Sequence, residues 1–67
     1  METVKIIELI GISKESWEDA ANNAILEATK TVNNITGLEV VAQTAKVENN
    51  KITTFRTNVK VAFVVEG

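Results

Sequence analysis

The chain has 67 residues, a formal net charge of −2, and neither cysteine nor histidine. This length allows one small domain, residues 1–67, whose core is marginal, and no disulfide or structural zinc site can reinforce it. The weakly acidic balance, without a basic block, argues against nucleic acid as a partner.

The high apolar content points to self-association. Apolar residues make up 45% of the chain, more than one helix and a few strands of this length can easily hide. No run approaches the roughly eighteen apolar residues of a membrane span, so we expect no membrane partner. Glu2, Lys5 and Glu8 would interrupt the apolar core of a signal peptide, and the lack of cysteine fits the cytoplasm, where we expect the protein.

The first predicted element is a strand, Thr3–Ile10, rich in β-branched residues. Both of its faces are largely apolar, whereas a strand on the outside of a monomer would show one polar face. Gly11 is expected to end this strand. Its second apolar face therefore needs a cover that this short chain does not supply.

One segment, Ser13–Asn34, carries a sustained helical period. One stripe of the predicted helix is mostly alanine, so a neighbouring sheet is expected to pack closely on it. Ser13 is predicted to cap the N-terminus of the helix and Gly37 its C-terminus. The stripe consists of Trp17, Ala20, Ala21, Ala24, Ile25, Ala28, Val32 and Ile35.

Two long strands, Leu38–Glu48 and Lys51–Val65, follow around a predicted turn at Asn49–Asn50. Glu48 would then face Lys51, and the pairing would continue outward unless a bulge shifts it. The face expected on the helix holds Leu38/Val61, Val40/Val59, Ala42/Thr57 and Thr44/Phe55, followed by Phe63 and Val65. The other face holds Glu39/Lys60, Val41/Asn58, Gln43/Arg56, Ala45/Thr54 and Val47/Ile52.

The predicted fold class is α+β, with the order β-α-β-β and a three-stranded antiparallel sheet wrapped around one helix. Exposed edges of such a sheet invite pairing with other copies. A closed, symmetric homo-oligomer is the expected outcome.

Four segments resemble the dodecin family along nearly the whole chain. They are KIIELIGIS at residues 5–13, SWEDAANNAI at 16–25, KTVNNITGLEVV at 30–41 and VKVAFVVE at 59–66. The resemblance implies a β-α-β-β subunit, a hollow homo-dodecamer of cubic symmetry, and a binding protein without catalytic turnover. It also implies storage of a flavin such as FMN, riboflavin or FAD, stacked in pairs at two-fold contacts, while some relatives bind calcium instead.

Two hallmarks of flavin-binding dodecins are missing from this sequence. Those proteins carry a Trp just ahead of the second strand, which stacks on the flavin ring, and Gly37 stands at that position here. They also carry a Gln after an aromatic residue in the last strand, where this chain has Phe55 followed by Arg56. Trp17 does not replace the missing ring, because it lies on the core stripe at the other end of the helix.

The predicted ligand residues are Arg56, Gln43 and Gly37. An Arg fork can meet a phosphate, a carboxylate or the carbonyl edge of a flavin. The alternative roles for Arg56 are a salt bridge between subunits or the lining of a wet cavity. Gly37 is interpreted first as a helix cap and second as the position at which the flavin-stacking Trp is missing. Glu39 and Lys60 are predicted to form a cross-strand ion pair.

Glu15, Glu18 and Asp19 are the candidate calcium ligands, since calcium takes six to eight oxygen ligands. One helix cannot close such a site, so a symmetry mate or waters would have to help. The alternative is that these carboxylates only complement the helix dipole.

An enzyme is not expected, because the chain has no His, no Cys, a single Asp and no Gly-rich phosphate loop. The sequence therefore predicts a non-catalytic, oligomeric binding or storage protein for a small ligand, with weak flavin binding. The alternative is a calcium-binding or purely structural shell that binds no flavin.

Overall fold

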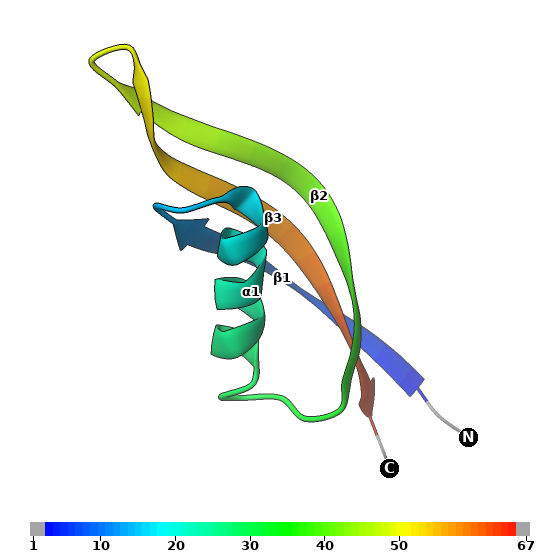
Figure 1. Ribbon diagram of the computed structural model, residues 1–67. Coiled ribbons are helices and arrows are strands. Elements are labelled where there is room, and N and C mark those ends of the chain that lie inside the picture. Colours follow the sequence, from blue (N-terminus) through cyan, green and yellow to red (C-terminus); the bar gives the residue numbers. More distant parts are fainter. Residues whose placement is uncertain (1–2, 66–67) are drawn as a thin grey trace.

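The computed structural model describes residues 3–65 and has four elements in the predicted order (Figure 1). They are strand β1 (Thr3–Ser13), helix α1 (Trp17–Ala28), strand β2 (Ile35–Glu48) and strand β3 (Lys51–Val65). The strands form one antiparallel sheet in the order β1-β3-β2. The predicted β-α-β-β fold is confirmed.

Helix α1 begins three residues later than expected, and Ser16 rather than Ser13 caps it. The Ser16 hydroxyl accepts a hydrogen bond from the backbone N–H of Asp19 at 3.0 Å. Ser13 is instead the last residue of β1, and its hydroxyl accepts from the N–H of Glu15 and donates to Asp19 Oδ2 at 2.6 Å. The predicted N-cap was wrong, because the strand extends through Gly11 and Ile12 before the chain turns.

The C-terminal end of α1 also differs from the prediction. The helix ends at Ala28, and the hydroxyls of Thr29 and Thr31 donate to the carbonyls of Leu26 and Ala28. Such local side-chain bonds, together with β-branched residues, weaken helix propagation. The left-handed residue is Asn34, with φ of 62°, so Gly37 is not a helix cap but part of β2 with an ordinary φ.

The core lies between α1 and the middle of the sheet, and the alanine stripe makes it shallow. Ala20, Ala24 and Ala28 are buried on the helix side, and Ala24 packs with the buried Val59 and Val61 of β3. The stripe is thus confirmed at its centre. Small side chains let the helix approach the sheet closely, which leaves few large groups to bury.

The closest approach of helix to sheet occurs at Gly11 of β1. A Cβ added there would overlap the carbonyl oxygen of Ala20 and press on the Ala24 methyl group. Only a glycine lets the backbone of the strand lie this near the helix.

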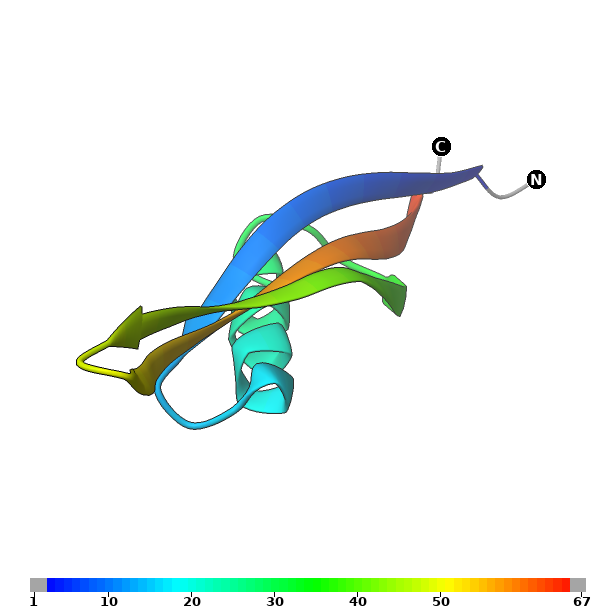
Figure 2. The ribbon, with the colours of Figure 1, turned by 90° about the horizontal axis from the view of Figure 1, so that it is seen from above.

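Helix α1 packs against β1 and β3 and makes little contact with β2. Figure 2 shows the chain from above, with the helix crossing the strands of the sheet at a steep angle. The prediction that Leu38 and Val40 pack under the helix was therefore wrong; they are 39% and 47% exposed. The cause is the strand order, which places β3 in the centre of the sheet and β2 at the far edge. The direct connection from β1 into α1 holds the helix above the opposite edge.

The pairing of β2 with β3 changes register at a bulge. Near the start of β2 the predicted pairs are correct, with Leu38 opposite Val61 and Glu39 opposite Lys60. Between Val40 and Ala42 the register shifts by one residue, so every pair from Ala42 to Lys46 moves. A second irregularity after Lys46 restores the predicted register at the hairpin end.

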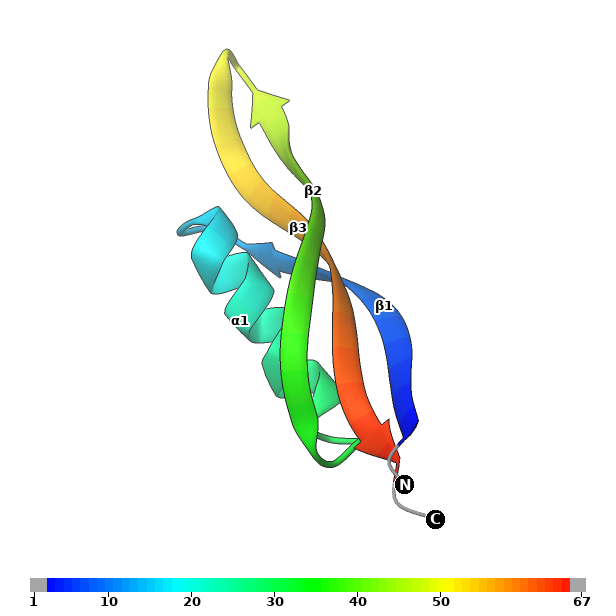
Figure 3. The ribbon, with the colours of Figure 1, turned by 90° about the vertical axis from the view of Figure 1, so that its right-hand side faces the viewer.

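The chain is long and narrow, measuring 52 × 19 × 13 Å, because the β2–β3 hairpin projects past β1 and α1 (Figure 3). Strand β1 ends at Ser13, opposite Phe55, so the hairpin beyond Phe55 is a two-stranded ribbon. Its turn uses Asn49 and Asn50, both with positive φ, as predicted.

Candidate functional site

The face of the sheet turned away from α1, called the outer face here, carries most of the predicted ligand positions. Thr57, Val59 and Val61 of β3 are buried on the helix side. Because side chains alternate along a strand, Arg56, Asn58 and Lys60 lie on the outer face. Gly37 belongs to the same face, since it pairs with Ala62.

Four large apolar side chains of β1 also lie exposed on the outer face and are called the β1 row. The alternate residues Ile7 and Leu9 pack on the core, so the row points away from the helix. The row consists of Val4, Ile6, Ile10 and Ile12, which are 55%, 55%, 61% and 54% exposed. The outer face is therefore an apolar surface interrupted by a few polar groups.

The structure does not bring Gln43 and Arg56 together. The bulge places Gln43 opposite Thr57, and Thr57 points toward the helix, where its hydroxyl donates to the Trp17 carbonyl at 2.8 Å. Arg56 lies opposite Thr44 and Ile12 on the outer face. The predicted pairing was wrong by one residue, and one residue is enough to send a strand's side chains to opposite faces.

Gly37 and Arg56 share the outer face but are far apart along it. Gly37 pairs with Ala62, which is six positions beyond Arg56 on β3. At about 3.3 Å per residue this is a separation of roughly 20 Å. Both positions can therefore touch one small ligand only if they come from two different copies of the chain.

Position 37 is open in the single chain. A Cβ added at Gly37 would meet nothing within 4 Å, and the backbone there has no positive φ. An alanine methyl group at this position would thus meet no obstacle among the described residues.

Trp17 is fully engaged in the structure of the chain. Its indole Nε1 donates to the carbonyl of Thr44 at 2.8 Å, and its ring meets that of Phe55 edge to face at 4.9 Å. Through these two contacts Trp17 packs the start of α1 against the β2–β3 hairpin, on the helix side of the sheet. That Trp17 does not act as the flavin-stacking ring stays a prediction.

The three candidate calcium ligands do not form a metal site within one chain. No group of three or more acidic side chains in residues 3–65 is arranged to hold a metal ion. Asp19 accepts a hydrogen bond from the Ser13 hydroxyl and helps to fix the helix start, while Glu15 and Glu18 are exposed. A calcium site built from these residues would need further oxygen ligands from a second copy or from water, and it stays a prediction.

The expected ion pair between Glu39 and Lys60 does not form. The two residues are directly opposite, with Glu8 on the other side of Lys60, yet the ion pair present in the described part of the chain is Lys30–Glu27 at 3.4 Å. Exposed charges on neighbouring strands gain little from direct contact, because water solvates both. The row Glu8–Lys60–Glu39 therefore presents uncommitted charges on the outer face.

One polar group of the outer face has no partner within residues 3–65. The side-chain oxygen Oδ1 of Asn58 is buried and accepts no hydrogen bond. Asn58 lies between Ile10 of β1 and Ala42 of β2, next to the bulge. A buried carbonyl without a donor lowers stability.

Asn58→Val is accordingly expected to leave the free energy of unfolding unchanged or to raise it by about 1 kcal/mol, since it removes an unsatisfied acceptor. Chemical denaturation monitored by Trp17 fluorescence measures this. A loss of more than about 1 kcal/mol would show that the carbonyl finds a donor outside the single chain.

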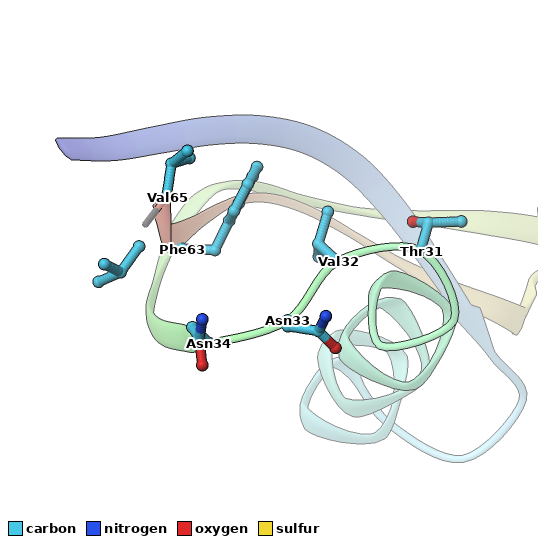
Figure 4. Close-up of a pocket in the computed structure, with 7 residues that line it drawn as sticks. Thr31, Val32, Asn33, Asn34, Phe63 and Val65 are labelled. Carbon is cyan, nitrogen blue, oxygen red and sulfur yellow. The ribbon is translucent and has the colours of Figure 1, made fainter. Parts of the chain in front are cut away.

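An open hollow of about 300 Å³ lies at the opposite end of the chain from the hairpin turn (Figure 4). Its lining is mixed: apolar side chains from β3 face the polar connection between α1 and β2. The lining residues are Thr31, Val32, Asn33, Asn34, Phe63, Val64 and Val65. None of the predicted ligand or metal residues lines it.

Within the described residues, 3–65, no helix is long and apolar enough to cross a membrane.

Solved structures of dodecins share this arrangement. The family model described as Dodecin matches residues 3–66. The chain is 35% identical over 63 residues to the calcium dodecin of Mycobacterium tuberculosis. This alignment covers 94% of this chain and 89% of that protein. The crystal structure of that calcium-chelating antigen, described as having a novel calcium-binding site, matches with a TM-score of 0.82 at 33% identity, over 96% of this chain and 91% of that one.

Two further solved structures match the fold closely. A mutant of the Thermus thermophilus dodecin gives a TM-score of 0.95 at 25% identity over 100% of both chains. The dodecin of Streptomyces davaonensis gives 0.93 at 26% identity, over 98% of this chain and 97% of that one. On the family match and the calcium dodecin relative together, this chain belongs to the dodecin family.

Proposed function

We propose that this chain is the subunit of a closed homo-oligomer, a dodecamer, that stores a small ligand without catalysing a reaction. The observation that carries the proposal is the β1 row, whose four side chains are each more than half exposed. Large apolar side chains exposed together on one face of a strand mark a surface that another molecule covers, even though Glu8 stands between Ile6 and Ile10. The Cys-free sequence supports the cytoplasm as its compartment.

The total surface of the chain supports the same conclusion. A compact monomer of 7.3 kDa exposes about 4,200 Å², whereas this chain exposes 4940 Å². The excess, roughly 700–800 Å², reflects the elongated shape of the chain, which leaves surface that other copies can cover.

Flavin is the first candidate ligand, bound weakly. The outer face offers an open position at Gly37 and a cationic one at Arg56, and both serve one ligand only when two copies meet. Without an aromatic ring at position 37, a flavin loses the stacking contact, which contributes roughly 0.5–1.5 kcal/mol beyond the buried area. We expect FMN, riboflavin and FAD to bind with micromolar or weaker affinity.

Calcium is the second candidate, and the calcium dodecin of Mycobacterium tuberculosis is the observation that favours it. The exposed carboxylates of Glu15 and Glu18 are available for a site that a second copy would complete. Calcium takes six to eight oxygen ligands, more than one chain offers at this helix start.

The side chains present support binding without turnover. The chain has no His and no Cys, and its one Asp, Asp19, accepts a hydrogen bond from Ser13 at the helix start. Histidine and cysteine, the side chains that most often act as base and nucleophile near neutral pH, are therefore missing, and the Glu8–Lys60–Glu39 row is spread over three strands rather than gathered in an apolar pocket.

Native mass spectrometry of the purified protein at micromolar concentration tests the assembly. We expect one discrete species near twelve copies and no folded monomer, because the exposed β1 row leaves the single chain marginally stable. A well-folded, stable monomer would contradict the proposal.

Thermal unfolding with and without calcium tests the second candidate. We expect the Tm to rise, because calcium at a hundred times its Kd stabilises the folded state by about 2.7 kcal/mol. The combined variant Glu15→Gln, Glu18→Gln should lose most of this rise, while magnesium serves as the control ion. An unchanged Tm would eliminate calcium, and an undiminished rise in the variant would move its site to other carboxylates.

A further inference from the structure

We infer that the root of the β2–β3 hairpin, on the outer face of the sheet, is a binding site for a phosphate group. The site, called the root patch here, consists of Thr44 and Lys46 of β2 together with Thr54 and Arg56 of β3. This inference rests on the proposed storage of a small ligand and deepens it, because it names a chemical group that the ligand carries.

The pairing of the two strands gathers these four side chains on one face. Thr44 lies opposite Arg56, at the last rung before β1 ends. Lys46 lies opposite Thr54. The ring of Phe55 packs on the helix side, and because side chains alternate along a strand, its neighbours in the patch point outward. Diagonal neighbours on two strands lie about 7–8 Å apart, so the long side chains of Lys46 and Arg56 can converge on one group between them.

All four side chains of the root patch are hydrogen-bond donors without a partner in the described part of the chain. Within residues 3–65 none of them forms an ion pair or a side-chain hydrogen bond. Arg56 offers a planar fork of N–H donors, Lys46 a compact ammonium, and each threonine a hydroxyl. Phosphate oxygens accept charge-assisted hydrogen bonds from donors of these kinds.

The charge of the hairpin differs in sign from that of the whole chain. Three cations and one carboxylate lie between residues 46 and 56, which gives this segment a formal charge of +2 in a chain whose net charge is −2. The carboxylate, Glu48, lies opposite Lys51 and accepts a hydrogen bond at 3.2 Å from a threonine hydroxyl of the same hairpin. No carboxylate stands at the positions paired with Lys46 or Arg56. An anion at the root patch therefore meets no fixed negative charge on these rungs.

Trp17 anchors the backbone of the root patch from the opposite side of the sheet. Its indole Nε1 donates to the carbonyl of Thr44 at 2.8 Å. Its ring packs edge to face on Phe55, which stands between Thr54 and Arg56. The donors are thus carried by a stretch of sheet that is held in place before a ligand arrives, which lowers the entropic cost of binding.

The preference of the protein for FMN over riboflavin tests this inference, because the two flavins share the ring and differ by one phosphate. We expect the parent protein to bind FMN at least about fivefold more tightly than riboflavin in titrations of flavin fluorescence. Raising the ionic strength from about 0.05 to about 0.5 M should remove most of this preference, because salt screens exposed charges. Equal affinities for the two flavins would overturn the root patch and leave flavin storage intact.

Lys46→Gln locates the phosphate, and Lys60→Gln is the matched control. Lys60 lies on the same face and loses the same charge, but it stands between Glu8 and Glu39. We expect Lys46→Gln to reduce the preference for FMN by at least about threefold and Lys60→Gln to retain it. A preference that survives Lys46→Gln, or that falls equally in both variants, would overturn the root patch. If Lys46→Gln fails to fold, Arg56→Gln takes its place, since the ratio of the two affinities reports the phosphate whatever the change does to binding of the ring.

Inorganic phosphate separates this inference from the proposed storage of flavin. Its binding is followed by phosphorus NMR in the parent protein and in Lys46→Gln. If neither flavin binds, phosphate that binds the parent but not the variant would support the root patch with a different source of the phosphate, and flavin storage would fail. If inorganic phosphate does not bind either, both the root patch and flavin storage are overturned.

Discussion

Gly11→Ala is expected to lower the free energy of unfolding by about 3 kcal/mol, at the upper end of the usual cost of overpacking. The added methyl group would overlap the carbonyl oxygen of Ala20, which belongs to the backbone of α1. A backbone atom cannot turn away as the end of a flexible side chain can, so the helix must move off the strand. That movement would also open the contacts of Ala24 with Val59 and Val61.

Urea denaturation measures this loss, and Gly37→Ala provides the matched control. A Cβ at Gly37 meets nothing within 4 Å, so alanine at this second glycine should change the free energy of unfolding by at most about 0.5 kcal/mol. A small increase is expected if the alanine mainly reduces the conformational entropy of the unfolded chain. Equal effects at the two glycines would mean that the close approach of α1 to β1 at Gly11 is not present in solution.

The combined variant Gly37→Trp, Arg56→Gln is expected to tighten flavin binding by at least about tenfold, or ~1.4 kcal/mol. The Trp supplies a stacking surface and the Gln replaces a cation with an amide that can both donate and accept hydrogen bonds. A left-handed glycine would have forbidden the change, but position 37 has an ordinary φ and open space around it. Titration of flavin fluorescence gives the affinity, since stacking on indole quenches the flavin.

The single variants serve as controls for this gain of function. Because positions 37 and 56 are roughly 20 Å apart in one chain, they act on one ligand only across a contact between copies. Each variant must therefore be shown to assemble before its affinity is compared. Tight quenching by the parent protein, or no improvement in an assembled double variant, would place the ligand elsewhere.

Local patterns in the sequence predicted the elements well and their ends poorly. The alanine stripe around Ala24 predicted the buried face of α1, because helical periodicity depends on neighbours a few residues apart. The true start and end of α1 depend on competing hydroxyl bonds, such as those of Ser13 and Thr29, that composition alone does not rank. The choice of Asn34 over Gly37 as the left-handed residue followed from the earlier end of the helix.

The arrangement of strands and the site depended on information that a pattern of single residues does not carry. The turn at Asn49–Asn50 predicted the outer pairs of β2 and β3, but nothing in the sequence marked the bulge beside Val41. That one extra residue moved Gln43 to the face opposite Arg56 and so divided the predicted ligand patch. The position of β3 between the other strands, which leaves Leu38 uncovered, is likewise a property of the whole fold.

The projecting hairpin has a consequence for how the chain folds. Among residues 3–65, neither a third strand nor the helix lies against its ribbon beyond Phe55, and an isolated two-stranded ribbon is marginally stable in water. Amide hydrogens in this arm should therefore exchange quickly whenever the chain is alone and slowly once copies hold it in place. Folding of the arm and association of the subunits would then be a single cooperative event, whose rate depends on protein concentration.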